Sequence, residues 1–80
     1  MLLSIGYKNY VNKNEVVSII NATSAPSKRM IESAKEQNLL VDATMGKKTN
    51  SIIVMKSGHI VLSHNGRETS VDRFNEIRMY

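Results

Sequence analysis

The sequence predicts a small single domain of the α+β class, with a four- or five-stranded, mostly antiparallel sheet and two helices. The chain has 80 residues, of which 41% are hydrophobic and 22% are charged, so it can bury one small core and is too short for two domains. Short β-branched segments recur along it, and only two stretches have the spacing of an amphipathic helix. We therefore treat residues 1–80 as one domain.

The N-terminal part of the chain has strand composition. Residues 2–5 and 10–11 are apolar and are separated by Gly6 and a polar pair, which is typical of an opening strand or hairpin with a turn in the middle. Residues 16–20 read Val-Val-Ser-Ile-Ile, a β-branched run that is too short for a helix. This run predicts a buried strand.

A helix is predicted next. Ser24 is a good N-cap, and Pro26 fits the first turn, where a missing N–H has no cost. The helix is expected to end near Gln37, with Asn38 as its C-terminal cap. The apolar stripe of this helix is narrow and consists of Met30, Ile31 and Ala34.

The second half of the chain predicts a strand over residues 39–43, a basic loop over 45–50 and then a β-hairpin. The hairpin strands are residues 51–56 and 59–63. Ser57-Gly58 separates them and is a spacer typical of two-residue hairpin turns.

The last residues predict a second, short helix. Asn65-Gly66 ends the preceding strand, and Thr69 followed by Asp72 resembles a capping box with aspartate in the place of glutamate or glutamine. Apolar residues at helical spacing follow, namely Val71, Phe74 and Ile77.

The strands predict more apolar surface than two short helices can cover. Residues 16–20 and 52–55 are apolar on both faces, a pattern that requires cover on both sides of a sheet. Small domains solve this problem with disulfides, a metal or oligomerisation, and the chain has no cysteine. We therefore expect a homo-oligomer. The alternative is a monomer in which the N-terminal segment covers one sheet face.

Composition excludes several classes of protein. Without cysteine there are no disulfides, iron–sulfur clusters or cysteine-ligated zinc sites. No apolar stretch approaches the roughly 18 to 20 residues of a membrane-spanning helix, and residues 1–6 lack the features of a signal peptide. A cytoplasmic protein is the expectation. The net charge of +4 and the pI near 9.6 favour an anionic partner.

No catalytic, metal or cofactor site is predicted, and no small-molecule substrate. His59 and His64 are five positions apart, so on one strand they would point to opposite faces. Asp42 interrupts an apolar strand, which is typical of a perturbed carboxyl group or, more often, of an acceptor for loop N–H groups or a partner of a lysine. An enzyme would need Asp42 and a histidine to converge in a pocket, and we expect a non-enzyme.

The basic loop is the best candidate for a binding site. Its glycine allows close approach of the backbone, its two lysines supply charge, and its last two residues add short donors, a mixture suited to phosphate oxygens. These residues are Gly46, Lys47, Lys48, Thr49 and Asn50. The alternative is an ordinary solvated turn.

Lys28-Arg29, at the start of the predicted helix, is a second basic pair. Because aromatic residues for base stacking are few, duplex DNA is favoured over a single strand.

Two motifs resemble a known family. They are Ser24-Ala25-Pro26-Ser27-Lys28-Arg29-Met30-Ile31 and Leu40-Val41-Asp42-Ala43-Thr44, the latter followed by Gly46-Lys47-Lys48-Thr49. With further similarity from Ile5-Gly6 to about Phe74, the chain resembles the RemA-like proteins, small bacterial regulators of extracellular matrix genes. The resemblance implies a DNA-binding protein of the bacterial cytoplasm, associated with the nucleoid, that activates transcription of biofilm-matrix operons.

The same resemblance implies a closed ring of about seven or eight subunits, with basic residues displayed outward. Such a ring would carry a total charge of roughly +28 to +32, enough to steer and wrap a polyanion. Repeated loops on a rigid ring add their weak contacts through avidity.

The chain departs from the family's pattern at two places. The basic pair after the glycine is usually Arg-Arg, whereas here it is Lys47-Lys48, and lysine keeps the charge but loses the planar fork that reads guanine. We therefore expect contacts to the DNA backbone more than to bases. Glu15 stands where the family often carries a basic residue, and the neighbouring Lys13 is the candidate substitute.

The sequence thus predicts a non-enzymatic, ring-forming regulator that binds double-stranded DNA mainly through Lys47 and Lys48. The supporting contacts are expected from Thr49, Asn50, Lys28, Arg29 and Lys13. The alternative is a non-enzymatic oligomeric scaffold that uses the same basic rim to bind a protein partner or an anionic membrane surface.

Overall fold

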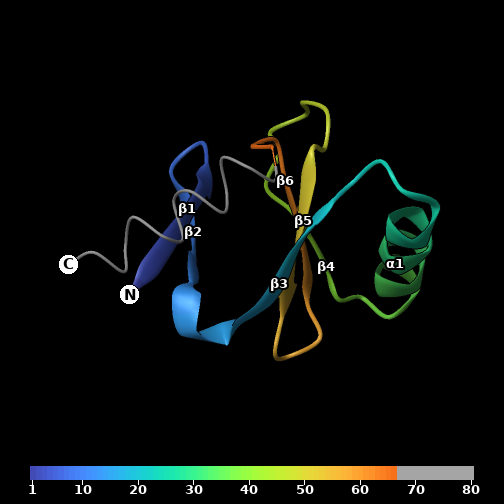
Figure 1. The fold of residues 1–80 in the computed structure, drawn as a ribbon, viewed down its shortest axis with the longest axis horizontal. Helices are drawn as coiled ribbons and strands as arrows, with labels where there is room; N and C mark the ends of the chain where they lie inside the picture. Colours follow the sequence, from blue (N-terminus) through green and yellow to red (C-terminus); the bar gives the residue numbers. More distant parts are fainter. Residues whose placement is uncertain (67–80) are drawn as a thin grey trace.

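The computed structural model describes residues 1–66 of the chain (Figure 1). Within this range the chain forms six strands, one α-helix and one short 3₁₀-helix. In chain order they are β1 (Leu2–Gly6), β2 (Asn9–Asn12), η1 (Lys13–Glu15), β3 (Val16–Asn21), α1 (Ala25–Glu36), β4 (Leu40–Asp42), β5 (Ser51–Met55) and β6 (Ile60–Ser63). The second helix predicted after Thr69 lies outside the described residues.

Four strands form the central sheet, in the order β3-β5-β6-β4. β5 pairs antiparallel with β3 and with β6, whereas β4 pairs parallel with β6. The parallel pair arises because α1 returns the chain across the sheet, so that β3 and β4 run in the same direction at opposite edges. The predicted four- or five-stranded, mostly antiparallel sheet is confirmed in part: the central sheet has four strands and is mostly antiparallel, but the opening strands form a separate two-stranded sheet.

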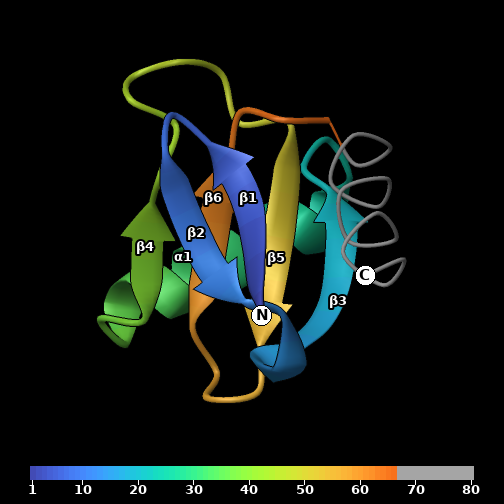
Figure 2. The same cartoon turned by 90° about the vertical axis from the view of Figure 1, so that its left-hand side faces the viewer.

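The N-terminal hairpin of β1 and β2 is a separate two-stranded sheet that lies across one face of the central sheet (Figure 2). The helix α1 covers the other face (Figure 1). The core under the hairpin is formed by Leu3, Ile5, Ala43, Ile53 and Val61. The core under the helix is formed by Ala22, Ala34, Ile52, Ile60 and Leu62, with Met30 and Ile31 of the predicted apolar stripe packed against it.

Both faces of the sheet are therefore covered within one chain. Ile52 and Ile53 are both 0% exposed and belong to opposite cores, because neighbouring side chains of a strand point to opposite faces. The N-terminal hairpin supplies the cover that we expected from a second copy. The alternative prediction, that the N-terminal segment covers one sheet face, describes this packing correctly.

Local sequence signals placed the helix and the second hairpin correctly. Ser24 caps α1, with its Oγ accepting a hydrogen bond from the Ser27 N–H at 3.3 Å, and Asn38 follows the helix with a φ of 59°. The β5–β6 connection, residues 56–59, is two residues longer than predicted, and within it the Gly58 N–H donates to the Met55 carbonyl at 3.0 Å. No helix in the described part of the chain is long and apolar enough to cross a membrane.

Candidate nucleic-acid interface

Several segments meet at one end of the molecule. Asn21, Ser51 and Ser63 are register partners at this end of the central sheet, and Ser63 Oγ donates a hydrogen bond to the Ile5 carbonyl at 2.8 Å. The β1–β2 turn and the β4–β5 loop therefore lie at the same end, uppermost in Figures 1 and 2. The start of α1 is joined to this end, because Ser27 Oγ donates to the Asn21 carbonyl at 2.6 Å. We call it the basic end, and its cationic residues are Lys8, Lys28, Arg29, Lys47 and Lys48.

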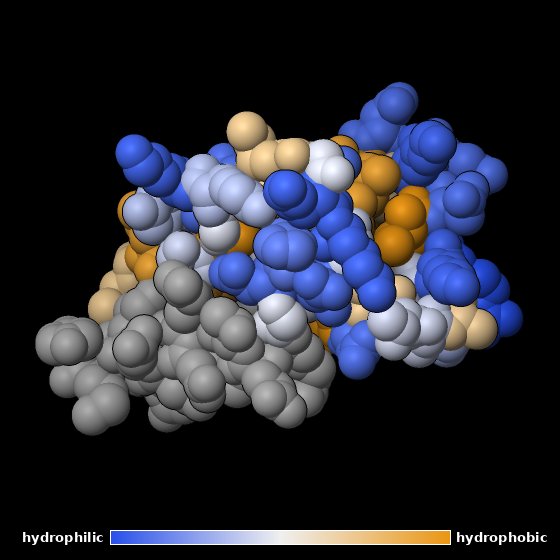
Figure 3. Space-filling view, turned by 90° about the horizontal axis from the view of Figure 1, so that it is seen from above, coloured by the Kyte–Doolittle hydropathy of each residue, from blue (hydrophilic) through white to orange (hydrophobic). Residues whose placement is uncertain are grey.

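The basic end carries little negative charge. The first turn of α1 has no acidic residue, and within residues 1–66 Asp42 is the one carboxylate on the strand ends, turns and loops of this end. Figure 3 views the molecule from this end, and hydrophilic surface extends over its centre and around the helix. On these strand ends, turns and loops, three cations, Lys8, Lys47 and Lys48, stand against one carboxylate and give a local positive excess that favours a polyanion.

The β4–β5 loop is held at its first end by Asp42. The carboxylate Oδ1 of Asp42 accepts hydrogen bonds from the hydroxyl of Thr44 at 2.6 Å and from its N–H at 2.9 Å. The hydroxyl bond, and after it the N–H bond, hold the pKa of Asp42 below its ordinary value. The next two residues have positive φ angles of 55° and 81°, and the Lys47 N–H donates to the Thr44 carbonyl at 3.0 Å. This tight turn leaves the two lysines exposed at the tip.

His64 holds the second end of the loop. Because a carbonyl only accepts, the His64 Nδ1 that lies 2.9 Å from the Lys48 carbonyl oxygen carries a proton and donates it. Asn50 adds two bonds, from its N–H to the Ser63 carbonyl at 2.9 Å and from its Nδ2 to the His64 carbonyl at 2.7 Å. No sequence pattern predicts this role, and His64 was considered only in the search for a catalytic or metal site. Only its position directly after a strand that ends beside the loop connects the two.

The β1–β2 turn touches the same histidine. The rings of Tyr7 and His64 are tilted by 34°, with their centroids 6.1 Å apart. Gly6 and Asn9 are register partners, so Tyr7 and Lys8 alone form the turn, and their φ angles are 51° and 62°. Tyr7, His64 and Lys48 therefore form a continuous series of contacts from the N-terminal turn to the basic loop.

The structure brings most of the predicted site residues to one end. Lys47 and Lys48 lie at the exposed loop tip, and Lys28 and Arg29 lie in the first turns of α1, which begins at the basic end. Lys13 is different, because η1 precedes β3 at the opposite end, where the Lys56 N–H donates to the Glu15 carbonyl at 2.7 Å.

Thr49 and Asn50 are half-buried rather than fully exposed. The amide nitrogen of Asn50 already donates within the chain. Asn50 therefore holds the loop, and this leaves Thr49 as the short donor beside the lysines.

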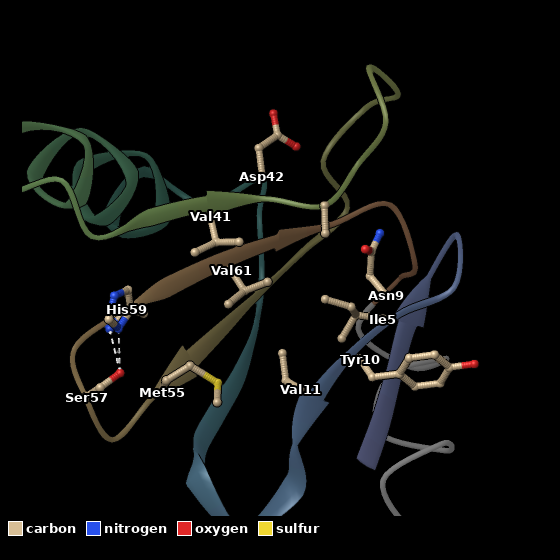
Figure 4. A pocket seen from close by; sticks show the side chains of 11 residues that line it. Ile5, Asn9, Tyr10, Val11, Val41, Asp42, Met55, Ser57, His59 and Val61 are labelled. Atoms are coloured by element: carbon tan, nitrogen blue, oxygen red, sulfur yellow. Dashed lines mark hydrogen bonds between the residues drawn. The ribbon is translucent and has the colours of Figure 1, made fainter.

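An open hollow of about 330 Å³ lies between the N-terminal hairpin and the β4 side of the sheet. Its lining includes Asp42 and His59, the pair that an enzyme would need to bring together. In Figure 4 the Asp42 carboxylate points away from the other labelled side chains, while His59 Nδ1 lies 2.6 Å from Ser57 Oγ. Residues 1–66 contain no group of three or more side chains that could hold a metal ion.

Comparison with known proteins shows the family of the chain. The family model of RemA-like proteins, described as extracellular matrix regulatory protein A-like, matches residues 2–74. The chain belongs to the RemA-like family. A relative from Oleidesulfovibrio alaskensis is 51% identical over 73 residues, which cover 91% of this chain and 87% of the relative. Relatives from Bacillus cytotoxicus and Bacillus mycoides are each 47% identical over 73 residues, covering 91% of this chain and 84% of the relative.

The names of the family and of these relatives indicate a regulatory protein. All three relatives carry the provisional name of a regulatory protein. The match contains the β1–β2 turn, the start of α1 and the basic loop of the RemA-like chain, so the whole basic end lies inside the family region. A regulatory name also favours a non-enzyme.

Proposed function

We propose that this RemA-like protein is a DNA-binding transcriptional regulator of extracellular matrix genes, which acts at the nucleoid in the bacterial cytoplasm. The observation that carries the proposal is the exposed Lys47-Lys48 pair at the tip of a loop that is anchored at both ends. Within residues 1–66 neither lysine is paired with a carboxylate. Both ammonium groups are therefore available for phosphate.

The DNA backbone is the expected contact. A lysine ammonium is a point charge that binds phosphate without the fixed geometry needed to read a base. Because the loop is already ordered, binding loses less conformational entropy than it would from a flexible tail. Lys28 and Arg29 extend the contact along the duplex from the helix side. Lys13 lies at the opposite end of the chain, so it reaches the same duplex only from a neighbouring subunit.

The test is fluorescence anisotropy of a labelled duplex over a series of salt concentrations, for the native protein and for the double variant Lys47→Ala/Lys48→Ala. The logarithm of the affinity falls with the logarithm of the salt concentration, with a slope of about 0.9 for each neutralised phosphate. Removal of two contacts should reduce the slope by about 1.8 for each engaged loop.

The natural comparison is Lys56→Ala, which removes one exposed lysine from the opposite end and should leave the slope unchanged. Affinities for unrelated duplexes should lie within about tenfold, or 1.4 kcal/mol. A hundredfold preference for one promoter would instead show that bases are read. A flat salt dependence in the native protein would overturn the proposal.

We also propose that the protein works as a ring of subunits. Within residues 1–66 the two edges of the central sheet are β3 and β4, and each exposes a valine, Val17 at 62% and Val41 at 45%. Edge strands with exposed apolar side chains can accept further strands or side chains. Because the two edges differ, joining one to the other is a head-to-tail contact, and such contacts close into rings when the rotation allows.

The scaffold alternative is favoured by one observation, the apolar Met45 beside the lysines. Met45 is 70% exposed at the loop tip, and an apolar residue among cations is typical of proteins that lie on anionic membranes. Flotation with vesicles containing an anionic lipid separates the two functions. Binding to vesicles that exceeds binding to duplex at equal salt would favour the membrane.

A further inference from the structure

We infer that the β1–β2 turn, Tyr7-Lys8, is a second phosphate-contacting element of the same surface, with Lys8 as its cation. The inference rests on the proposed DNA binding and adds a contact site that comes from a different part of the fold. Three observations carry it, namely the strained backbone of the turn, its contact with the basic loop and its charge.

The turn has a conformation that its residues do not favour. A two-residue hairpin turn with positive φ at both positions is normally made by Asn-Gly or a similar pair. Here the positions are held by Tyr7 and Lys8, whose φ angles are 51° and 62°. Side chains with a Cβ rarely adopt this region, so the folded state is less stable than it would be with asparagine or glycine. Strain of this kind clusters at sites where the side chains have a function.

The turn and the basic loop are connected by direct contacts. The Tyr7 ring lies against the His64 ring, with 6.1 Å between centroids, and His64 Nδ1–H donates to the Lys48 carbonyl at 2.9 Å. Gly6, at the end of β1, lies next to Asn65, where a Cβ would be in ordinary van der Waals contact with Asn65 Oδ1 at 3.4 Å. The position of the turn relative to the loop is therefore fixed by packing.

The charge of the turn fits the same ligand. Lys8 is exposed and, within residues 1–66, is not paired with a carboxylate. Asp42, the carboxylate of the basic end, is already engaged by Thr44. A turn that projects an ammonium group at the same end of the molecule as Lys47 and Lys48 offers a third point of contact to a phosphate backbone.

Because the turn is strained, one substitution can distinguish the loss of a phosphate contact from a loss of folding. Asparagine adopts positive φ more readily than lysine, so Lys8→Asn should raise the midpoint temperature of unfolding, by about 4 °C. At the same time it should lower the salt slope of duplex binding by about 0.9 for each engaged subunit and weaken binding at 0.15 M salt about fivefold. A variant that is more stable and yet binds less cannot owe the loss to misfolding.

Two further variants complete the design. Lys56→Asn removes the same charge from the turn at the opposite end and should change neither the slope nor the affinity. Lys8→Arg keeps the charge and should retain the salt slope of the native protein. If Lys8→Asn leaves the slope unchanged while Lys47→Ala/Lys48→Ala reduces it, the turn is not a contact and the proposed function stands. If the native protein shows no salt-dependent binding, the proposed function itself fails.

Discussion

At the scale of single residues, Asp42 shows why a carboxylate persists at a cationic end. Thr44 is 2% exposed, so its N–H and hydroxyl need a partner inside the fold. Asp42 Oδ1 accepts from both groups. A buried donor without a partner costs about 1–3 kcal/mol, which is more than the repulsion between an exposed carboxylate and a distant phosphate. The carboxylate of Asp42 therefore helps to hold the loop that carries Lys47 and Lys48.

The lowered pKa of Asp42 predicts a pH dependence of stability. The stabilisation by this carboxylate is fully present above its unfolded pKa of about 3.9, and it is lost as the pH falls through the lower folded value. Asp42→Asn should be less stable than the native protein at pH 7, by roughly 0.5–1 kcal/mol, because the exposed carboxylate is screened by solvent. Near pH 2 the two proteins should be equally stable.

Urea unfolding of the native protein and of Asp42→Asn at pH 7, 4 and 2 measures this difference. Asp42→Glu is the useful comparison, because it keeps the charge and lengthens the side chain. A loss that is the same at every pH would show that the ionised carboxylate is not what holds Thr44.

At the scale of elements, the sequence predicted structures that depend on neighbouring residues and did not predict contacts between distant ones. The helix start depends on Ser24 and Pro26, and the second hairpin depends on Ser57-Gly58, so residues a few positions apart determine each element. The contact from His64 to the Lys48 carbonyl joins residues 16 positions apart. No spacing rule predicts such a contact, because the fold alone brings the end of β6 beside the loop.

The cover of the second sheet face by the N-terminal segment was predicted only as the alternative to a second copy, for a related reason. Leu3 and Ile5 alternate with polar or small residues, and this alternation is typical of a hairpin with one buried face. The pattern was present, but it does not state which surface receives the apolar face. The turn itself was predicted, but its backbone conformation was not, because Tyr7-Lys8 is not a sequence that predicts two residues with positive φ.

Removing an anchor of the basic loop should weaken duplex binding without reducing the number of phosphate contacts. His64→Ala removes the donor to the Lys48 carbonyl, so the loop must be ordered when it binds. Duplex affinity should fall about three- to tenfold, as expected for one lost hydrogen bond. The salt slope should stay the same, since no phosphate contact is removed.

His64→Asn should restore much of the affinity, because an amide Nδ2 can donate from nearly the position of the imidazole Nδ1. His59→Ala, in the hairpin at the opposite end, is the matched control. A drop in slope as large as that of the double lysine variant would show that His64 itself contacts DNA.

At the scale of the whole molecule, both faces of the central sheet are covered, so self-association would have to use the edges of the sheet. The hairpin and α1 bury both faces within residues 1–66, so oligomerisation does not have to complete the core. In this part of the chain β3 and β4 are the edge strands of the central sheet, and each carries an exposed valine. If subunits join through these edges, each subunit should stay folded when the contacts between subunits are broken.

A charge at one edge should therefore break the assembly without unfolding the subunit. Val17 is 62% exposed on β3, so Val17→Asp removes few contacts within the chain but places a carboxylate in the proposed interface. Sedimentation velocity should give one large species for the native protein and a smaller species for the variant, with an unchanged far-ultraviolet circular dichroism spectrum. Ala25→Asp adds the same charge on α1, where an acid at a helix start is favourable, and should leave the large species intact.

Because avidity multiplies the weak contacts of each basic end, Val17→Asp should also weaken duplex binding by at least a hundredfold. A native protein that sediments as a folded monomer at micromolar concentration would defeat the ring, and DNA affinity would then have to come from one basic end alone.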